Sequence, residues 1–269
     1  MPQNTNLNVS PYFDDFVDSK NYHKVLFKPG FPVQARELTT LQSILQNQVE
    51  KFGQHFFKEG SMVVPGGTTF DDEYFSVKID PNFLNIPVSN YTKVLVDNAI
   101  RIKGETSGAE AVVVNRITSS ESIDGFDTLY VKYTKSGEDG VTSAFLDGEN
   151  LITLSNINYL NTSITADSQF ARCIVSDATS VGSAFSVSEG IFFIRGFFVA
   201  NVTSTIILDQ YTNKPSYRVG FLLKEETIGP SSVNSDLYDN AKGFSNESAP
   251  GADRFKLSTV LHKKLLTDT

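Results

Sequence analysis

The chain has 269 residues, of which 40% are hydrophobic and 20% charged, and 23 Lys and Arg stand against 31 Asp and Glu, a formal net charge of −8. This length predicts one or two domains with a substantial core, and the acidic balance argues against nucleic acid and anionic membranes as partners. A single cysteine, Cys173, excludes an internal disulfide framework and a cysteine-rich zinc site. No run of about 18 apolar residues is present, so we expect no membrane insertion.

Residues 1–31 are predicted to form an extended N-terminal arm. The aromatic residues Tyr12, Phe13 and Phe16 have no helical period, and the run from Lys28 to Pro32 is rich in turn residues. Solvated tails are seldom this aromatic. We therefore expect these rings to dock on the core of the same chain or on that of a neighbouring subunit.

Residues 32–59 carry the period of one long amphipathic helix, with Pro32 suited to its first position. The apolar residues repeat at steps of three and four: Leu38, Leu41, Leu45, Val49, Phe52 and Phe56. We expect the stripe to pack against the sheet of the same subunit. A stripe this narrow also suits a helix–helix seam, so a symmetric oligomer contact is the alternative. Gly53 interrupts the pattern, which indicates either a bend or the close approach of another backbone.

From residue 60 onward the pattern is almost entirely that of β-strands. Short apolar runs at about ten-residue spacing, the first a strand at Lys93–Val96, predict a small inserted β-barrel-like domain over 92–154, within a main β-domain over 60–91 and 155–269. Residues 155–180 are rich in Ser, Thr and Asn and are expected to be connective. The predicted fold class is mainly β with one long N-terminal α-helix, built of β-sandwich or barrel-like units. The apolar run from Gly190 to Ala200 predicts a buried strand pair or a bent strand. Residues 229–254 read as a long polar loop. The last apolar alternation stops near residue 261, as expected for one portion of a longer polypeptide.

Residues that could carry chemistry are few and scattered. The three histidines, His23, His55 and His262, have no metal-ligand spacing. Ser107, in the segment from Gly104 to Gly108, lies at the wrong offset for a nucleophile elbow, so a β-turn is predicted there. Neither nucleotide-binding fingerprint is present. Adjacent acidic residues fit solvated turns or caps better than a cation site or a glycosidase pair. We therefore predict no catalytic residue, no metal, no cofactor and no enzyme activity.

The N-terminal block resembles a family of virion structural proteins. The motif SPYFDDF at Ser10–Phe16 opens this block, and similar runs follow along the chain at Lys20–Leu38, Leu41–Gln48, Phe57–Met62, Gly190–Val199, Leu208–Gly220 and Asp239–Ala252. Such proteins occur in large contractile-tailed bacteriophages, notably those of marine cyanobacteria, as tail-fibre or baseplate-associated components. The resemblance implies assembly in the host cytoplasm, a place in the virion and a structural role. It supplies no catalytic residues.

The leading hypothesis is therefore a structural component of a phage tail, either the baseplate-proximal attachment domain of a tail fibre or a baseplate protein. Its partners would be copies of itself, as a homotrimer, and other tail proteins. The interface residues would be the arm rings and the helix stripe. The alternative is a module that recognises host-surface glycan, which would need a cluster such as Tyr211, Tyr217, Tyr238 and Asp239. A third hypothesis, a polysaccharide-degrading enzyme, requires a pair of carboxylates across a groove.

Overall fold

A computed structural model describes residues 3–232, 237, 245, 249 and 251–268. The predicted fold class is confirmed: the chain is mainly β, with a long N-terminal helix and antiparallel sheets. The helices are α1 (Ala35–Phe56) and α2 (Ser89–Asp97), with a 3₁₀ turn at Asp18–Lys20. The strands are β1 (Ser61–Val64), β2 (Thr68–Ile79), β3 (Asn82–Phe83), β4 (Ile86–Pro87), β5 (Arg101–Gly104), β6 (Glu110–Ile117), β7 (Asp127–Lys135), β8 (Asn150–Thr153), β9 (Ile157–Tyr159), β10 (Thr162–Ile164), β11 (Ser168–Arg172), β12 (Thr179–Val187), β13 (Gly190–Ile194), β14 (Phe197–Asn201), β15 (Ser204–Asp209), β16 (Tyr217–Ile228) and β17 (Arg254–Leu265).

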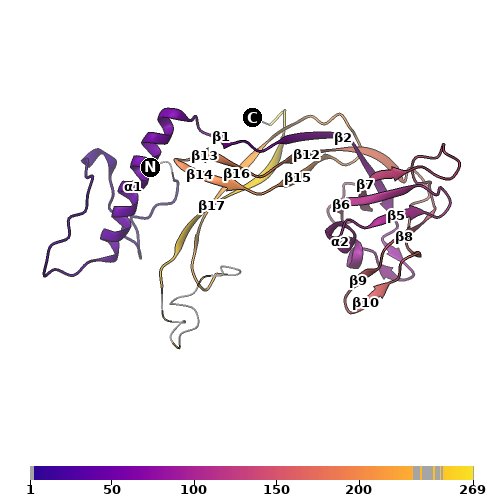
Figure 1. Ribbon diagram of the computed structural model, residues 1–269, viewed down its shortest axis with the longest axis horizontal. Coiled ribbons are helices and arrows are strands. Elements are labelled where there is room, and N and C mark those ends of the chain that lie inside the picture. Colours follow the sequence, from indigo (N-terminus) through magenta and orange to yellow (C-terminus); the bar gives the residue numbers. More distant parts are fainter. Residues whose placement is uncertain (1–2, 233–236, 238–244, 246–248, 250, 269) are drawn as a thin grey trace. The chain divides into compact units, whose positions relative to one another are not determined.

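The chain divides into two compact units, each built from several segments of the sequence. The helix unit comprises Met1–Thr68, Val187–Ser204 and Val219–His262, and the barrel unit comprises Thr69–Ser186, Thr205–Arg218 and Lys263–Thr269. Figure 1 labels α1, β1, β13 and β14 of the helix unit, and α2 with β5–β8 of the barrel unit. The boundaries differ from the predicted ones because strands outside 92–154 pair with strands inside it.

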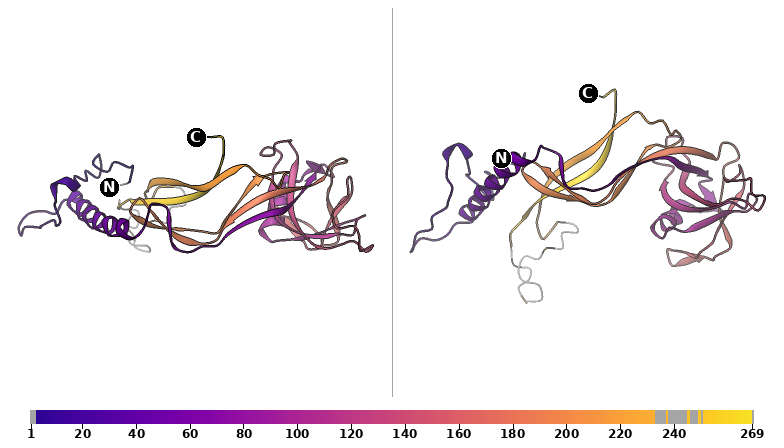
Figure 2. Two further views of the ribbon diagram at one scale, coloured as in Figure 1. Left: turned by 90° about the horizontal axis from the view of Figure 1, so that it is seen from above. Right: turned by 45° about the horizontal axis from the view of Figure 1, so that its top comes forward.

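The barrel unit contains an eight-stranded sheet in the order β11-β8-β5-β6-β7-β2-β12-β15. Its first and sixth strands meet where an antiparallel bridge joins Ile79, at the end of β2, to Cys173, just after β11. Backbone hydrogen bonds from Asp80 N–H to Arg172 O (2.9 Å) and from Ile174 N–H to Lys78 O (3.2 Å) extend this contact. Six strands are thereby closed into a ring (Figure 2). A barrel was predicted, but the expected domain at 92–154 lacks the β2 and β11 strands that close it.

Helix α2 packs its apolar side on β6 and β9 and so covers part of the barrel core. Tyr91 and Leu95 are buried, and the Tyr91 hydroxyl donates a hydrogen bond to the Phe170 carbonyl at 2.5 Å. The prediction of a strand at Lys93–Val96 is wrong. A four-residue apolar run does not distinguish strand from helix, and here the i, i+4 pair of Tyr91 and Leu95 decides.

The predicted connective segment at 155–180 is also different in the structure. It forms the β9–β10 hairpin, β11 and the start of β12. Polar residues at hairpin turns and on the exposed faces of short strands conceal their β pattern. The predicted turn at Gly104–Gly108 is present, and the Glu149 carboxylate holds it by accepting from the N–H groups of Thr106 (3.0 Å) and Ser107 (2.9 Å).

The core of the helix unit is a cluster of phenylalanine rings. The apolar run at 190–200 forms the β13–β14 hairpin, with Arg195 and Gly196 at positive φ in its turn, so the strand-pair alternative holds. Phe193 is fully buried, and its ring lies 5.9 Å from Phe57 and 5.4 Å from Phe198, between centroids. The predicted polar loop at 229–254 falls largely outside the described residues.

Candidate assembly surface

Helix α1 begins at Ala35 rather than at Pro32 and ends at Phe56 rather than at residue 59. Its first turn is set by Glu37, whose carboxylate accepts a hydrogen bond from the Gln34 N–H at 2.9 Å. This hydrogen bond is one of the two that form a capping box between Gln34 and Glu37, and it makes Gln34 the N-cap of the helix. The end of the helix passes directly into Phe57, which belongs to the phenylalanine cluster.

The face of α1 that its own chain covers is mostly polar, with Ile44 as its one large apolar residue. The buried positions are Ser43, Ile44, Asn47, Glu50 and Gly53. The arm binds this face through two aspartates. Asp14 accepts a hydrogen bond from the Ser43 hydroxyl, and Asp18 accepts from the Asn47 amide at 2.9 Å. The Lys51 ammonium also donates to Asp18, at 2.7 Å. Hydrogen bonds from Lys51 and Asn47 lower the pKa of the Asp18 carboxyl below its usual value.

The β13–β14 hairpin covers the rest of the polar face. The Gln46 amide donates to the Gly196 carbonyl at 2.7 Å. Gly53 lies so close to Phe193 that an added Cβ would be 2.4 Å from the ring. Of the two explanations proposed for Gly53, close approach is the right one, although a ring rather than a backbone approaches. Gly196 is packed just as tightly against the Glu50 side chain.

The apolar stripe of α1 lies on the opposite side of the helix. We name its exposed residues the α1 seam: Leu38, Leu45, Val49, Phe52 and Phe56, which are 43–67% exposed. Leu41, at the edge of the stripe, is partly buried. The prediction that the stripe packs on the sheet of its own subunit is therefore wrong. The hydrogen-bonding groups of Ser43, Gln46 and Asn47 are satisfied by the arm and the hairpin, and those contacts hold the apolar side outward.

The arm is extended as predicted, but its rings differ in their surroundings. Tyr12 and Phe16 are partly buried, and the Tyr12 hydroxyl donates to the Asp253 carboxylate. Phe13 is exposed at positive φ. No ring of the three is among the buried core residues, so the prediction that they dock on a core stays a prediction.

The start of the arm is held by a partly buried carboxylate on β16. Glu225 accepts hydrogen bonds from the N–H groups of Asn4 (3.0 Å) and Thr5 (2.9 Å) and from the Thr5 hydroxyl (2.7 Å), and it pairs with Arg195. Burial acts to raise the pKa of Glu225, but the donors from Asn4, Thr5 and Arg195 outweigh it and lower the pKa to about 2. Residues 4 and 5 are therefore tied to the helix unit by charge-assisted hydrogen bonds.

The part of the arm that precedes α1 leaves further apolar surface uncovered. We name residues 22–33 the arm loop, and Figure 2 shows it in indigo, extending away from α1. Its exposed large side chains are Tyr22, Leu26, Phe27, Phe31 and Val33. Together with the α1 seam, the arm loop forms a candidate assembly surface on the helix unit. Sequence reasoning selected the stripe but overlooked Leu26 and Val33, which have no periodic signal.

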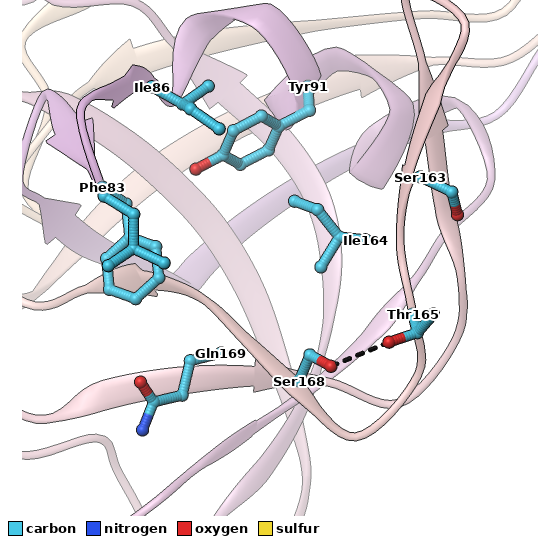
Figure 3. Close-up of a pocket in the computed structure, with 9 residues that line it drawn as sticks. Phe83, Ile86, Tyr91, Ser163, Ile164, Thr165, Ser168 and Gln169 are labelled. Carbon is cyan, nitrogen blue, oxygen red and sulfur yellow. Dashed lines mark hydrogen bonds between the residues drawn. The ribbon is translucent and has the colours of Figure 1, made fainter.

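A cleft of about 280 Å³ lies in the barrel unit. It is lined by residues of the β3–β4 hairpin, α2, β10 and β11, without a charged side chain (Figure 3). Its polar groups are largely engaged: the Thr165 and Ser168 hydroxyls bond to each other at 2.9 Å, and the Gln169 amide donates to Glu105 at 2.7 Å. Figure 3 shows Ile164 turned inward and the Ser163 hydroxyl turned away. The cleft is thus mainly apolar.

The residues proposed for glycan recognition do not form a free cluster. Lys78 lies over the Tyr211 ring, 4.1 Å from its centroid, and the Tyr211 hydroxyl is within 2.9 Å of Asp124. Lys263 lies over the Tyr217 ring. Tyr238 and Asp239 fall outside the described residues.

The groups with catalytic potential are dispersed or buried. His23, His55 and His262 are exposed. Cys173 is fully buried, and burial raises the pKa of its thiol to about 12. Among the residues that the structure describes, no group of three or more His, Cys, Asp or Glu side chains could hold a metal ion. No helix in the same part of the chain is long and apolar enough to cross a membrane.

Residues 10–122 match a family described as a domain of unknown function (DUF4815). The matched segment includes most of the arm, all of α1 and the first strands of the barrel unit, but less than half of the 269 residues. The searches found no matching curated protein and no matching solved structure.

Proposed function

We propose that this protein is a structural component of a contractile phage tail, located at the baseplate or at the baseplate-proximal end of a fibre. It acts by subunit–subunit assembly, with copies of itself as a homotrimer and with other tail proteins. The observation that supports this proposal most is the candidate assembly surface, on which the α1 seam and the arm loop expose large apolar side chains. Large apolar side chains exposed together along one face of a helix are typical of interaction sites. The resemblance of the N-terminal block to virion structural proteins points the same way.

The physical argument is that exposed apolar side chains would stabilise an assembly when a partner covers them. Each large apolar side chain that a partner covers contributes on the order of 1.5–3 kcal/mol. The seam and the arm loop together present ten such side chains, Tyr22, Leu26, Phe27, Phe31, Val33, Leu38, Leu45, Val49, Phe52 and Phe56. In a virion these groups would be covered permanently, and a net charge of −8 would keep the free subunit dispersed until it assembles.

The alternative proposal, recognition of a host-surface glycan, has less support. The uncharged cleft has the size of a small-molecule site, but its hydroxyl and amide groups are mostly engaged with protein partners, which leaves few donors for sugar hydroxyls. Tyr211 and Tyr217 are likewise occupied by lysines. No glycan subsite is therefore assigned.

The experiment is to locate the chain in virions of the phage that encodes it. Purified particles are analysed by mass spectrometry and decorated with gold-labelled antibody raised against the barrel unit. The proposal expects the chain in the particles and label on the tail near the baseplate. Label on the capsid, or absence of the chain from particles whose host cells contain it, would overturn the proposal.

A further inference from the structure

The α1 seam has the spacing of a coiled coil. Leu38, Leu45 and Phe52 recur every seven residues, and Gln42, Val49 and Phe56 recur in the same way four positions later. The combined steps alternate four and three along the whole helix, as the a and d positions of a heptad do. Gln42, exposed like the others, is the one polar member of the series.

The helix cannot turn its seam toward its own subunit without losing the contacts that hold it. Ser43 and Asn47 are bound by the arm aspartates, and Gln46 is bound by the β13–β14 hairpin. The Phe193 ring packs directly on Gly53, where any side chain would collide with it. Rotating the helix would move Gly53 away from the ring and bring a larger residue into its place. The partner of the seam must therefore come from another molecule.

The positions beside the seam indicate which molecule fits. On one side lie Leu41, Gln48 and His55, and on the other lie Thr39, Gln46 and Gly53. None of these carries a carboxylate, ammonium or guanidinium group. In coiled coils, charges at the flanking positions set partner choice, and like charges there keep identical helices apart. A seam with uncharged flanks lets identical helices approach even though the whole chain carries a net charge of −8.

Gln42 determines the direction of the partner helix. In a parallel, in-register arrangement each Gln42 faces another Gln42, and the amides satisfy each other as donor and acceptor. In an antiparallel arrangement centred on residue 47, Gln42 would face Phe52, and its amide would be buried without a partner, which costs about 1–3 kcal/mol. The same parallel register stacks Phe52 and Phe56 on their own copies.

From these observations we infer that the α1 helices of neighbouring copies of this chain associate in parallel and in register through the α1 seam, with Gln42 as the polar layer that sets the register. This inference deepens the proposed function, because it assigns self-assembly to α1 and leaves the arm loop to other tail proteins. It rests on that proposal only for its biological setting. The seam geometry stands on the helix itself.

The test uses single cysteine substitutions in the full chain. Gln42→Cys places the thiol in the proposed polar layer. Gln54→Cys, at an exposed position near the end of the covered side of α1, is the matched control. Native Cys173 stays silent because it is fully buried. After mild oxidation, the inference expects disulfide-linked chains for Gln42→Cys and none for Gln54→Cys. In an antiparallel pair the two introduced thiols would be ten residues, about 15 Å, apart along the axis, so no bond would form.

A second pair of variants tests the seam without a cross-link. Phe52→Glu should reduce the mass measured by light scattering to that of a single chain. Gln54→Lys adds a charge away from the seam and keeps a donor beside Glu50, which Gln54 contacts, so it should leave the assembled mass unchanged. Circular dichroism checks that both variants keep the helix. A monomeric native chain at 100 µM, or a Phe52→Glu variant that still assembles, would overturn the inference. A cross-linked chain that is absent from virions would overturn the proposed tail location alone, and a tail-located chain without the cross-link would overturn the seam alone.

Discussion

The two helices of this protein use their amphipathic character in opposite ways. In α2 the apolar residues Tyr91 and Leu95 are buried in the barrel core, and the polar side faces solvent. In α1 the buried residues include Ser43, Asn47 and Glu50, and the apolar side is exposed. The first arrangement stabilises the subunit that contains it. The second holds a helix in place by polar contacts and keeps its apolar side for another molecule.

The two units are also held together by different interactions. The barrel unit is held by a continuous set of buried apolar side chains drawn from seven strands and α2. In the helix unit, the arm is attached through the carboxylates of Asp14, Asp18 and Glu225. Burial of apolar groups is insensitive to pH, whereas carboxylate contacts depend on the charge of the acid. Changes that probe one kind of contact should therefore leave the other unit intact.

The largest expected effect comes from a matched pair of leucine substitutions. Leu95→Ala in α2 should lower the free energy of unfolding of the barrel unit by about 2–5 kcal/mol, because Leu95 is fully buried and a cavity would remain. Leu45→Ala in α1 should change the stability of the free monomer by less than about 0.5 kcal/mol, because Leu45 is 58% exposed. Urea unfolding, at a dilution where light scattering gives a single-chain mass, measures both. Similar losses for the two variants would erase the contrast between the helices.

That contrast marks the limit of what the sequence could predict. The 3–4 spacing from Leu38 to Phe56 correctly predicted a helix and its apolar side. It could not say what covers that side, because periodicity describes one helix and carries no information on its partner. The choice depends on the hydrogen bonds from Ser43 and Asn47 to Asp14 and Asp18, 29 residues earlier in the chain. No local pattern signals such a contact.

The barrel was similarly predictable only in part. The alternating run around Val77 and the short apolar runs around Val113 and Val131 identified strands of β2, β6 and β7. Closure by Ile79 and Cys173 joins residues 94 positions apart and has no sequence signal. The domain limits at 92 and 154 were therefore wrong, while the type of architecture was right. The candidate assembly surface shows the same division: the stripe and an aromatic arm were predicted, but Leu26 and Val33 of the arm loop were not.

The second prediction sharpens the contrast between charged and apolar contacts. Glu225→Gln should weaken docking of the arm start by about 2 kcal/mol, since hydrogen bonds to a charged acceptor are replaced by neutral ones, and amide hydrogen exchange at Asn4 and Thr5 should become roughly 30-fold faster. The adjacent Glu226→Gln is the control, because Glu226 makes only surface pairs with Lys224 and Lys256.

The same contact predicts the pH at which the arm is released. The pKa of Glu225 is lowered from its usual 4.5 to about 2. A lowered carboxyl pKa means that the stabilisation is complete above about pH 4.5 and is lost as the pH falls toward 2. The protection factors at Asn4 and Thr5, which are corrected for the intrinsic pH dependence of exchange, should therefore fall over this window in the native chain and stay constant in Glu225→Gln. An arm that remains protected at pH 2 would contradict the assignment.

A smaller effect is expected at the contact between α1 and the phenylalanine cluster. In an open helix Gly→Ala stabilises by about 1 kcal/mol. Gly53→Ala should instead destabilise the helix unit by about 1–2 kcal/mol, because the new methyl group would lie 2.4 Å from the fully buried Phe193 ring. Gln48→Ala, at an exposed position of the same helix, should be neutral within about 0.5 kcal/mol. Chemical denaturation followed by circular dichroism measures both, and a gain for Gly53→Ala would show that α1 is not held against β13.

The smallest effect concerns Glu50, a buried carboxylate on the covered face of α1. Glu50 is buried, and within the described residues its Oε2 has no hydrogen-bond partner. Burial raises the pKa of Glu50 above its usual value, so the charged form present at pH 7 is disfavoured in the folded chain. Glu50→Gln should therefore stabilise the helix unit at pH 7 by about 0.5–1 kcal/mol, since a neutral amide costs less to bury than a charged oxygen.

The pH dependence and a control on the same helix make this prediction decisive. The gain from Glu50→Gln should disappear below about pH 4, where native Glu50 is protonated in both folded and unfolded chains. Glu37→Gln should act in the opposite direction at pH 7 and cost about 0.5 kcal/mol, because Glu37 reaches back to the Gln34 N–H and favours the helix N-terminus. Urea midpoints at pH 7 and pH 4 measure both variants. If Glu50→Gln proved destabilising, the Glu50 carboxylate would be well hydrogen-bonded in the folded chain. The covered face of α1 would then stabilise the subunit as the buried face of α2 does.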